Sequence, residues 1–204
     1  YTNKNPLVGK LLNINGAGIQ YSWLKRLIGA TSYEDMNNMA KTAPIGSEDL
    51  MIYPFGNGSE RIFENKILNT NFKNINLNTH TSAHLCRATL EGIAFAFFYG
   101  IEILKNDEIE IKVLKVGNDN LFRSEVFINT IASLINAPIE RYNTTGAVGA
   151  ARASSVENKN ISDLSNKITS QDFVDSVKPD KDLKKYKEAY NKWKYNLKSL
   201  ISSI

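Results

Sequence analysis

The sequence predicts an α/β domain in which a mixed sheet is flanked by helices and an amphipathic helix ends the chain. The main observation is a long, almost entirely apolar helix pattern over 82–104, which is typical of a helix that packs on two sides. A strand pattern, a helix, a short strand and a further helix start follow it between 109 and 153. Strands joined through a helix usually pair in parallel, so this run is expected to form the parallel part of the sheet.

The segments that precede the long helix alternate between strands and helices. A strand is expected over 7–14, and the glycines that follow it open a helix over 18–28. Ser32 is expected to cap a second helix, because its hydroxyl can accept an unpaired N–H and Asp35 lies three residues further on. The remaining expectations are a strand at 50–55, a glycine-rich loop at 56–61 and an asparagine-rich, mostly irregular segment with one weak strand pattern at 64–80.

The segments that follow the long helix complete the sheet and its cover. We expect a strand at 109–116, a helix at 121–135, a strand at 138–142 and a helix that starts at Gly146. The chain is polar over 157–179, where we expect a connector made of loop and a short helix. Over 180–204 we expect a docked terminal helix. Its apolar residues recur at spacings of three and four, namely Leu183, Tyr186, Tyr190, Trp193, Leu197 and Ile201.

Composition narrows the class of protein. With 204 residues, 42% hydrophobic and 23% charged, and a net charge of +4, the chain can bury one ordinary core. It has no run of about 18 apolar residues and no signal-peptide core at its start, so we expect a cytoplasmic protein that contacts no membrane. The excess lysine lies on the terminal helix without interleaved base-stacking aromatics, which favours a solvated face over nucleic-acid binding.

The cysteine and the two histidines offer little chemistry. Cys86 is the single cysteine, so a disulfide framework within the chain is excluded. His80 and His84 lie four residues apart, but no third ligand and no H-E-x-x-H arrangement accompany them, so we expect no metal site. His84 is expected to make a polar contact in the first turn of the long helix, and His80 to lie in the loop before it.

Two acidic positions call for partners. Glu91 lies on the apolar helix, where a buried carboxylate needs a counter-charge, and Arg87 is one helical turn earlier. Glu60 and Arg61 follow the glycine-rich loop and are expected to tie it to the domain body through an ion pair, with no catalytic role.

Two glycine turns between a strand and a helix are candidates for nucleotide binding, because such a turn presents backbone N–H groups and the positive end of a helix dipole to phosphate. The first contains Gly16, with Gln20 four residues on. The second contains Gly117, followed by Asn118 and Asn120. Each turn also has a purely structural interpretation, as a bend that needs the conformational freedom of glycine. The chain has neither a G-x-x-x-x-G-K-[ST] nor a G-x-G-x-x-G motif.

Four segments together resemble the C-terminal half of the FGGY carbohydrate kinases, and among these the xylulose kinases most. The segments are NGAGIQYSWLKR (15–26), PFGNGSERIF (54–63), HLCRATLEG (84–92), and VGNDN (116–120) with NTTGAVGAARA (143–153). HLCRATLEG matches the core of the second signature of the family. One departure is Asn74-Ile75, where the family usually has a glycine followed by a hydrophobic residue.

The resemblance implies an actin-like, ribonuclease-H-like ATPase domain, with ATP and Mg²⁺ held in a cleft between two such domains. It implies that the γ-phosphoryl group passes to a sugar hydroxyl, with D-xylulose as the expected sugar and xylulose 5-phosphate as the product. Gly16 and Gln20 match positions that flank the nucleotide in this family. In the second turn Gly117 carries over best, and Asn118 and Asn120 follow it. The catalytic Asp and most sugar contacts of the family lie in its N-terminal half, so we expect 1–204 to be a C-terminal, nucleotide-binding fragment with no catalytic residue and no metal ligand.

Two rival functions stay open. One is a kinase of the same family that acts on another polyol or sugar, such as glycerol, ribulose or gluconate. The other is a non-enzymatic actin-like module, or a nucleic-acid-binding protein that uses the basic tail. A single lobe of a two-lobed kinase would also leave an apolar face uncovered, which favours a homodimer.

Overall fold

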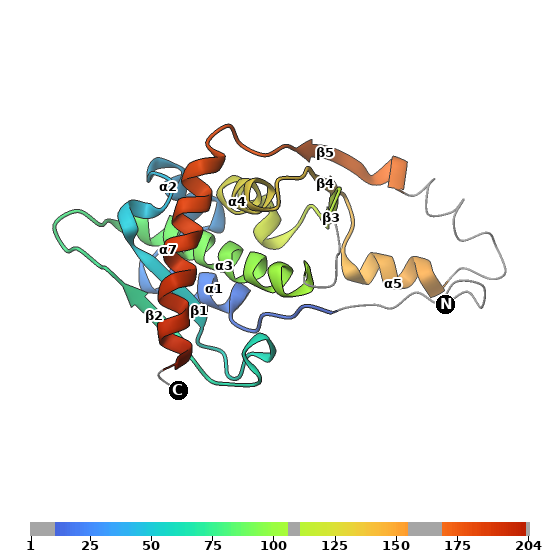
Figure 1. The fold of residues 1–204 in the computed structure, drawn as a ribbon. Helices are drawn as coiled ribbons and strands as arrows, with labels where there is room; N and C mark the ends of the chain where they lie inside the picture. Colours follow the sequence, from blue (N-terminus) through green and yellow to red (C-terminus); the bar gives the residue numbers. More distant parts are fainter. Residues whose placement is uncertain (1–10, 106–110, 155–168, 203–204) are drawn as a thin grey trace.

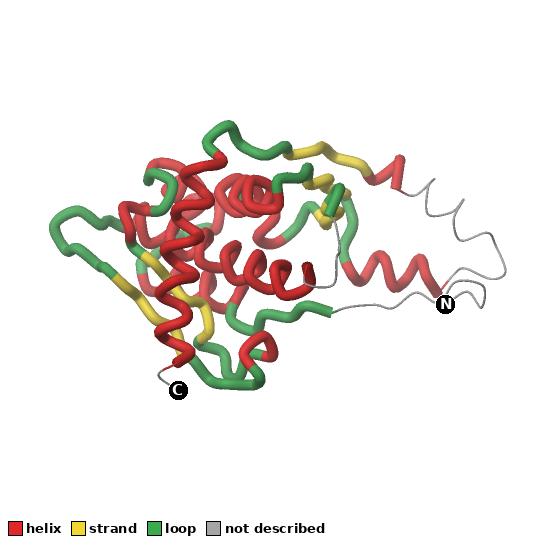
Figure 2. The backbone as a smooth tube through the Cα atoms, in the orientation of Figure 1, coloured by secondary structure: helices red, strands yellow, loops and turns green. Residues whose placement is uncertain are grey.

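The computed structural model describes residues 11–105, 111–154 and 169–202, and Figure 1 shows their arrangement. The described strands are short and form two small sheets, while helices make up most of the body (Figure 2). The helices are α1 (Ala17–Leu27), α2 (Tyr33–Thr42), α3 (Ser82–Lys105), α4 (Glu125–Ile135), α5 (Gly146–Ser154) and α7 (Leu183–Ser202), and the strands are β1 (Met51–Phe55), β2 (Asn69–Lys73), β3 (Leu114–Gly117), β4 (Ile139–Tyr142) and β5 (Phe173–Val177).

The larger sheet contains β3, β4 and β5 in that order. β3 and β4 run parallel, with Leu114 opposite Ile139 and Gly117 opposite Tyr142. This confirms the parallel pairing predicted across the helix between them. β4 and β5 are antiparallel, so the sheet is mixed, as the sequence predicts. β1 and β2 form a separate antiparallel pair, which lies on the other side of α3 in Figure 1.

The strand β5 is missing from the sequence prediction, which expected only loop and a short helix over 157–179. Of that segment, 157–168 lie outside the described residues. The five residues of β5 are exposed or half-buried, so they carry no apolar run that would mark a strand. Its position depends on long-range partners instead, because β4 supplies the hydrogen bonds and Arg141 forms an ion pair with Asp175.

Two predicted strands are shorter than expected or absent. The strand expected at 109–116 begins at Leu114, while its first two residues lie outside the described part of the chain. Residues 11–14, the described end of the strand expected over 7–14, have no regular structure. A strand needs a neighbour for its hydrogen bonds, and no strand within the described ranges pairs with these four residues.

Helix α3 runs through the centre of the molecule and contacts α1, α2, α4, α7 and β1 (Figure 1). Its side chains are buried nearly all round, as the apolar pattern predicts. Gly92 explains how closely the helix approaches β1, because a Cβ atom at this position would lie 2.2 Å from the carbonyl oxygen of Ile52. The glycine of the HLCRATLEG segment therefore serves the packing of the core.

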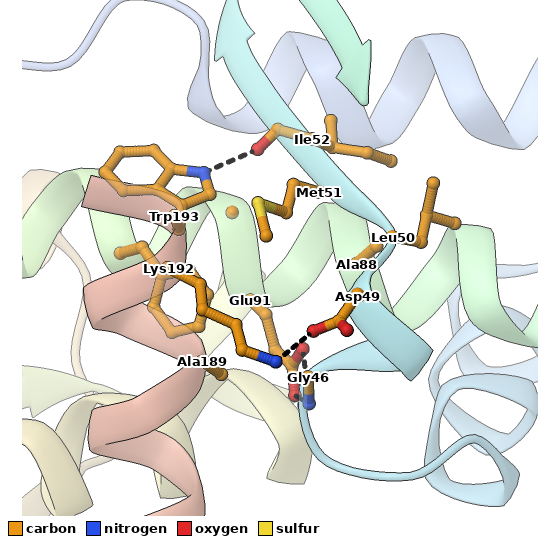
Figure 3. A pocket seen from close by; sticks show the side chains of 12 residues that line it. Gly46, Asp49, Leu50, Met51, Ile52, Ala88, Glu91, Ala189, Lys192 and Trp193 are labelled. Atoms are coloured by element: carbon orange, nitrogen blue, oxygen red, sulfur yellow. Dashed lines mark hydrogen bonds and ion pairs between the residues drawn. The ribbon is translucent and has the colours of Figure 1, made fainter. Parts of the chain in front are cut away.

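The terminal helix α7 crosses the front of the domain in Figure 1 and docks through an aromatic stripe. Trp193 is buried, and its Nε1 donates a hydrogen bond to the carbonyl oxygen of Ile52 at 3.0 Å (Figure 3). The ring of Tyr53 stacks on Trp193 at 5.1 Å between centroids. These contacts fix α7 to the strand β1.

The predicted pair between Arg87 and Glu91 is present inside α3, where the Arg87 Nε lies 2.7 Å from the Glu91 Oε1. Both carboxylate oxygens of Glu91 also accept from the backbone N–H of Gly46 at 3.1 Å (Figure 3). The Ser47 hydroxyl donates to the same carboxylate at 3.4 Å. This buried carboxylate therefore anchors the turn after α2, in which Ser47, like the two residues after it, has a left-handed backbone. A left-handed backbone is strained in residues other than glycine, and it persists where surrounding contacts hold it in place.

Candidate functional site

The turn that opens α1 consists of Asn15 and Gly16 and is pressed against β1. A Cβ atom on Gly16 would lie 1.5 Å from the carbonyl oxygen of Pro54. Only glycine fits this approach, even though its backbone dihedral angles are in the ordinary right-handed region. The close approach sets where α1 starts, so this glycine has a structural reason as well as any ligand-related one.

Glu60, near the end of the glycine-rich loop, holds the same turn through its side chain. Its side chain is 0% exposed, and its two carboxylate oxygens accept from the backbone N–H of Asn15 at 3.1 Å and of Gly16 at 3.2 Å. Glu60 therefore ties the loop to the domain body as predicted, but through backbone donors and not through the predicted ion pair. Burial raises the pKa of this carboxyl, and the two backbone hydrogen bonds partly oppose that shift.

Further hydrogen bonds join the glycine-rich loop to the turn. The Asn15 Nδ2 donates to the carbonyl oxygen of Ser59 at 2.7 Å. In the other direction, the Asn57 Nδ2 donates to the carbonyl oxygen of Asn15 at 3.0 Å. Together with Glu60, these contacts make the loop a clamp on the start of α1.

Gln20 lies one helical turn into α1 and is 5% exposed. The Thr70 hydroxyl of β2 donates to its Oε1 at 2.8 Å, which leaves the amide nitrogen Nε2 as the free end of the group. Among the described residues this Nε2 is the buried side-chain polar atom that has no hydrogen-bond partner. A buried donor without an acceptor is costly, so its partner is expected to come from outside the described chain.

An open cavity of about 460 Å³ lies beside Gly16 and Gln20, between α1 and β2. The rings of Trp23 and Phe72, 5.8 Å apart, form an apolar wall. Amide and hydroxyl groups, the cation Arg26, Ile19 and two glycines form the rest of the lining. The cavity, hereafter the first cavity, is lined by Gly16, Ile19, Gln20, Trp23, Arg26, Gly56, Asn69, Thr70 and Phe72.

A second cavity, of about 600 Å³, lies on the other side of α1, toward α2 and the start of α4. The stacked rings of Tyr21 and Tyr33, 5.7 Å apart, contribute to one wall. Two cations border it, and the Lys41 Nζ pairs with Glu125 at 2.8 Å. Its lining is Gly18, Tyr21, Tyr33, Glu34, Asn37, Asn38, Lys41, Asn120, Leu121, Arg123 and Ser124.

The five predicted nucleotide residues fall into two groups. Gly16 and Gln20 lie together on the first cavity, and Asn120 lines the second. Gly117 and Asn118 line neither cavity. At Gly117 a Cβ atom would lie 2.6 Å from the carbonyl oxygen of Thr144, so this glycine permits close packing at the ends of β3 and β4.

Several cavity residues were not singled out from the sequence. Thr70 orients the Gln20 amide, yet it lies in the asparagine-rich segment that predicts mostly irregular structure. The Arg123 Nε donates to the carbonyl oxygen of Asn118 at 3.2 Å and so links the second glycine turn to the second cavity. Contacts of this kind join residues far apart in the chain or depend on a turn geometry, and no local pattern marks them.

The two histidines serve the start of α3. The His84 Nδ1 accepts from the backbone N–H of Thr81 at 3.2 Å, and the His80 Nδ1 accepts from that of Asn76 at 3.0 Å. Within the described ranges, no three side chains of His, Cys, Asp or Glu converge in a way that could hold a metal ion. The histidines are therefore part of the loop and helix start in which the sequence places them.

Comparison with known proteins identifies the fold and the family. The model of the C-terminal domain of the FGGY family of carbohydrate kinases matches residues 5–157. The xylulose kinase of Haemophilus influenzae is 26% identical over 106 residues, which is 52% of this chain and 21% of that protein. The chain spans about a quarter of the length of the curated relatives it matches.

Solved structures agree on the fold. The ligand-bound xylulose kinase of Lactobacillus acidophilus superposes with a TM-score of 0.75 at 19% identity, covering 93% of this chain and 39% of that one. The glycerol kinase of Plasmodium falciparum with ADP gives 0.73 at 18% identity, covering 90% and 37%. The actin-like ATPase fold is thereby confirmed.

Every helix in the described part is too short or too polar to cross a membrane. The chain belongs to the FGGY family of carbohydrate kinases and represents its C-terminal domain.

Proposed function

We propose that this chain binds the ATP of a sugar kinase, and that the whole protein transfers the γ-phosphoryl group to D-xylulose. The observation that carries the nucleotide part is the buried, unpartnered Nε2 of Gln20 beside Gly16 on the first cavity. A ribose hydroxyl or a ring nitrogen of the base would supply the acceptor that this amide lacks. Thr70 supports this role, because its hydrogen bond fixes the amide with the nitrogen left free.

We assign Gly117, Asn118 and Asn120 to the same nucleotide. Asn120 has a cavity position and a left-handed backbone with φ of 47°, which holds its side chain at the edge of the second cavity. Arg123 lies beside it and would offer a cation to phosphate oxygens. α1 lies between the two cavities and contributes to the lining of both, so the two glycine turns approach a common helix.

The described residues do not by themselves fit a magnesium site. Mg²⁺ in such enzymes is held by one or two carboxylates and by substrate phosphates. Of the described residues that line the two cavities, Glu34 is the one carboxylate. No step of the reaction is therefore assigned to a metal held by this chain.

The chemistry of transfer depends on positioning a hydroxyl, a carboxylate and the nucleotide in one place. This chain would hold and orient the nucleotide, and the base that accepts the sugar proton would come from another domain. The choice of D-xylulose over glycerol, ribulose or gluconate follows the xylulose kinases among the relatives. A kinase that draws on ATP and a free sugar would act in the cytoplasm.

Calorimetric titration with MgADP tests the nucleotide part. We expect binding, and a melting temperature that rises with MgADP, because a ligand that binds only the folded state stabilises it. Gln20→Leu should weaken binding, whereas the matched control Gln171→Leu, at an exposed glutamine of the same chain, should not. A folded chain that shows no heat and no shift at millimolar MgADP would contradict the proposal. Sugar-dependent ADP production, measured with D-xylulose, glycerol, ribulose and gluconate in the presence of the N-terminal half of a related kinase, tests the substrate.

A further inference from the structure

Glu60 is a buried carboxylate, and one of the two backbone groups that it binds belongs to a residue of the first cavity. Its two oxygens accept the N–H groups of Asn15 and Gly16, and Gly16 lines that cavity. Within the described residues no Lys, Arg or His forms an ion pair with it. No charged side chain in the described part of the chain balances this carboxylate, so its charge is opposed by the two backbone donors and by the positive end of the α1 dipole.

The position of Glu60 changes what the start of α1 can bind. A helix start that follows a glycine turn is an anion site because its N–H groups point outward and the helix dipole is positive there. In this chain the donors of Asn15 and Gly16, which directly precede the first helical residue Ala17, are already occupied by a carboxylate of the protein itself. A phosphate at the same turn would lose those donors and would be repelled by the charge.

The uncharged part of a nucleotide faces no such conflict. Gln20, one turn further along α1, offers a neutral donor, and the Trp23–Phe72 wall offers an apolar surface for a base. The clamp made by Glu60 and Asn57 determines where α1 starts, and therefore where Gln20 stands. A shift of the turn by an ångström would move the amide away from its acceptor.

We infer that Glu60 is a positioning residue for nucleotide binding, which fixes the turn at Asn15 and Gly16 and reserves the start of α1 for the nucleoside, with the phosphates held elsewhere. This inference rests on the proposed nucleotide-binding function. It assigns to Glu60 a role that acts through Gly16 and Gln20, without contact to the ligand.

The test compares calorimetric titrations of adenosine and MgADP against the 204-residue chain, Glu60→Gln and the matched control Glu91→Gln. Glutamine at 60 can accept one backbone N–H, but its own NH₂ would then face the second as donor against donor. We expect Glu60→Gln to weaken both ligands by about tenfold, since a buried donor loses its acceptor and the turn moves. Glu91→Gln alters an equally buried, backbone-bonded carboxylate away from both cavities and should leave both affinities unchanged.

The outcomes separate this inference from the proposed function. If the unaltered chain binds neither ligand, the proposed function fails and the role of Glu60 fails with it. If the unaltered chain binds MgADP and Glu60→Gln binds both ligands as well as it does, the positioning role alone is overturned. If Glu60→Gln tightens MgADP and leaves adenosine unchanged, the phosphates bind at the turn and the assignment to the nucleoside is wrong.

Asn57→Ala keeps the inference testable should Glu60→Gln fail to fold. Asn57 is exposed, so its loss removes one hydrogen bond of the clamp without burying or exposing a charge. We expect weaker binding of adenosine and MgADP together, by a few fold. Unchanged affinity for both would count against the clamp.

Discussion

Glu60 and Glu91 are both buried carboxylates that accept the backbone N–H of a glycine, yet their surroundings differ. Glu91 is balanced by the Arg87 guanidinium at 2.7 Å and receives a hydroxyl as well as the Gly46 N–H. Glu60 receives two N–H groups and no cation within the described residues. The pKa of each carboxyl is raised by burial, and at Glu91 the guanidinium opposes the shift.

The difference follows the position of each group in the molecule. Glu91 lies beneath the docked helix α7, in a region that is closed by Trp193 and Ala189 (Figure 3). Glu60 binds the backbone of Gly16, which lines the first cavity together with the unpartnered amide of Gln20. A side-chain cation balances Glu91, whereas Glu60 is held by backbone donors at the start of α1, the helix that also carries the unsatisfied donor of Gln20.

Breaking the compensated pair should have the largest effect on stability. Arg87→Ala leaves Glu91 buried without its counter-charge and removes a hydrogen bond to the carbonyl oxygen of Ala43. We expect the free energy of unfolding to fall by about 3–5 kcal/mol. Urea denaturation followed by circular dichroism measures it. A loss well under 1 kcal/mol would mean that α3 is held by its apolar contacts alone.

Gly16→Ala should have the next largest effect, because the added Cβ would lie 1.5 Å from a backbone oxygen of Pro54. Either β1 or the turn must move, at a cost of about 1–3 kcal/mol, and nucleotide binding should fall with it. Gly18→Ala is the matched control, since nothing lies within 4 Å of its Cβ position. Within a helix, that change should stabilise the chain by about 0.5–1 kcal/mol. Equal behaviour of the two variants in thermal melting would refute the close approach at Gly16.

These two regions also show what could be read from the sequence and what could not. The long helix and the Arg87–Glu91 pair were predictable, because a helix brings residues four apart together. The hydrogen bond from the Gly16 N–H to Glu60 spans 44 residues, and nothing in the local pattern of either segment indicates it. Sequence reasoning could therefore locate Gly16 and Gln20 as candidates but expected an ion pair for Glu60 in place of its bonds to backbone donors. Similarly, β5 depends on β4, so its own residues did not identify it.

Glu60 should also make the stability of the chain depend on pH, with a smaller effect than the two substitutions above. Its pKa in the folded chain is raised above the ordinary value of 4.5, so the folded state binds more protons than the unfolded state between the two pKa values. Stability contributed by the protonated form is present below the unfolded pKa and is lost as the pH rises through the folded one. Relative to Glu60→Gln, the unaltered chain should therefore lose stability as the pH rises from 4.5 through the raised pKa of Glu60. Parallel profiles in urea titrations would show that the charge is better compensated than the contacts indicate.

The smallest effect on stability is expected at an exposed ion pair near the buried Glu91. Lys192 of α7 forms an ion pair with Asp49 at 2.6 Å, and both side chains are more than half exposed (Figure 3). Exposed pairs contribute about 0–1 kcal/mol and are screened by salt. Lys192→Ala should therefore lower the melting temperature slightly at low ionic strength and not at all in concentrated salt. The buried pair at Arg87, which water and ions do not reach, should keep its effect under both conditions. A loss at Lys192 as large as that of Arg87→Ala would mean that α7 is held in place by charge, and that Trp193 and its aromatic neighbours contribute less than their burial indicates.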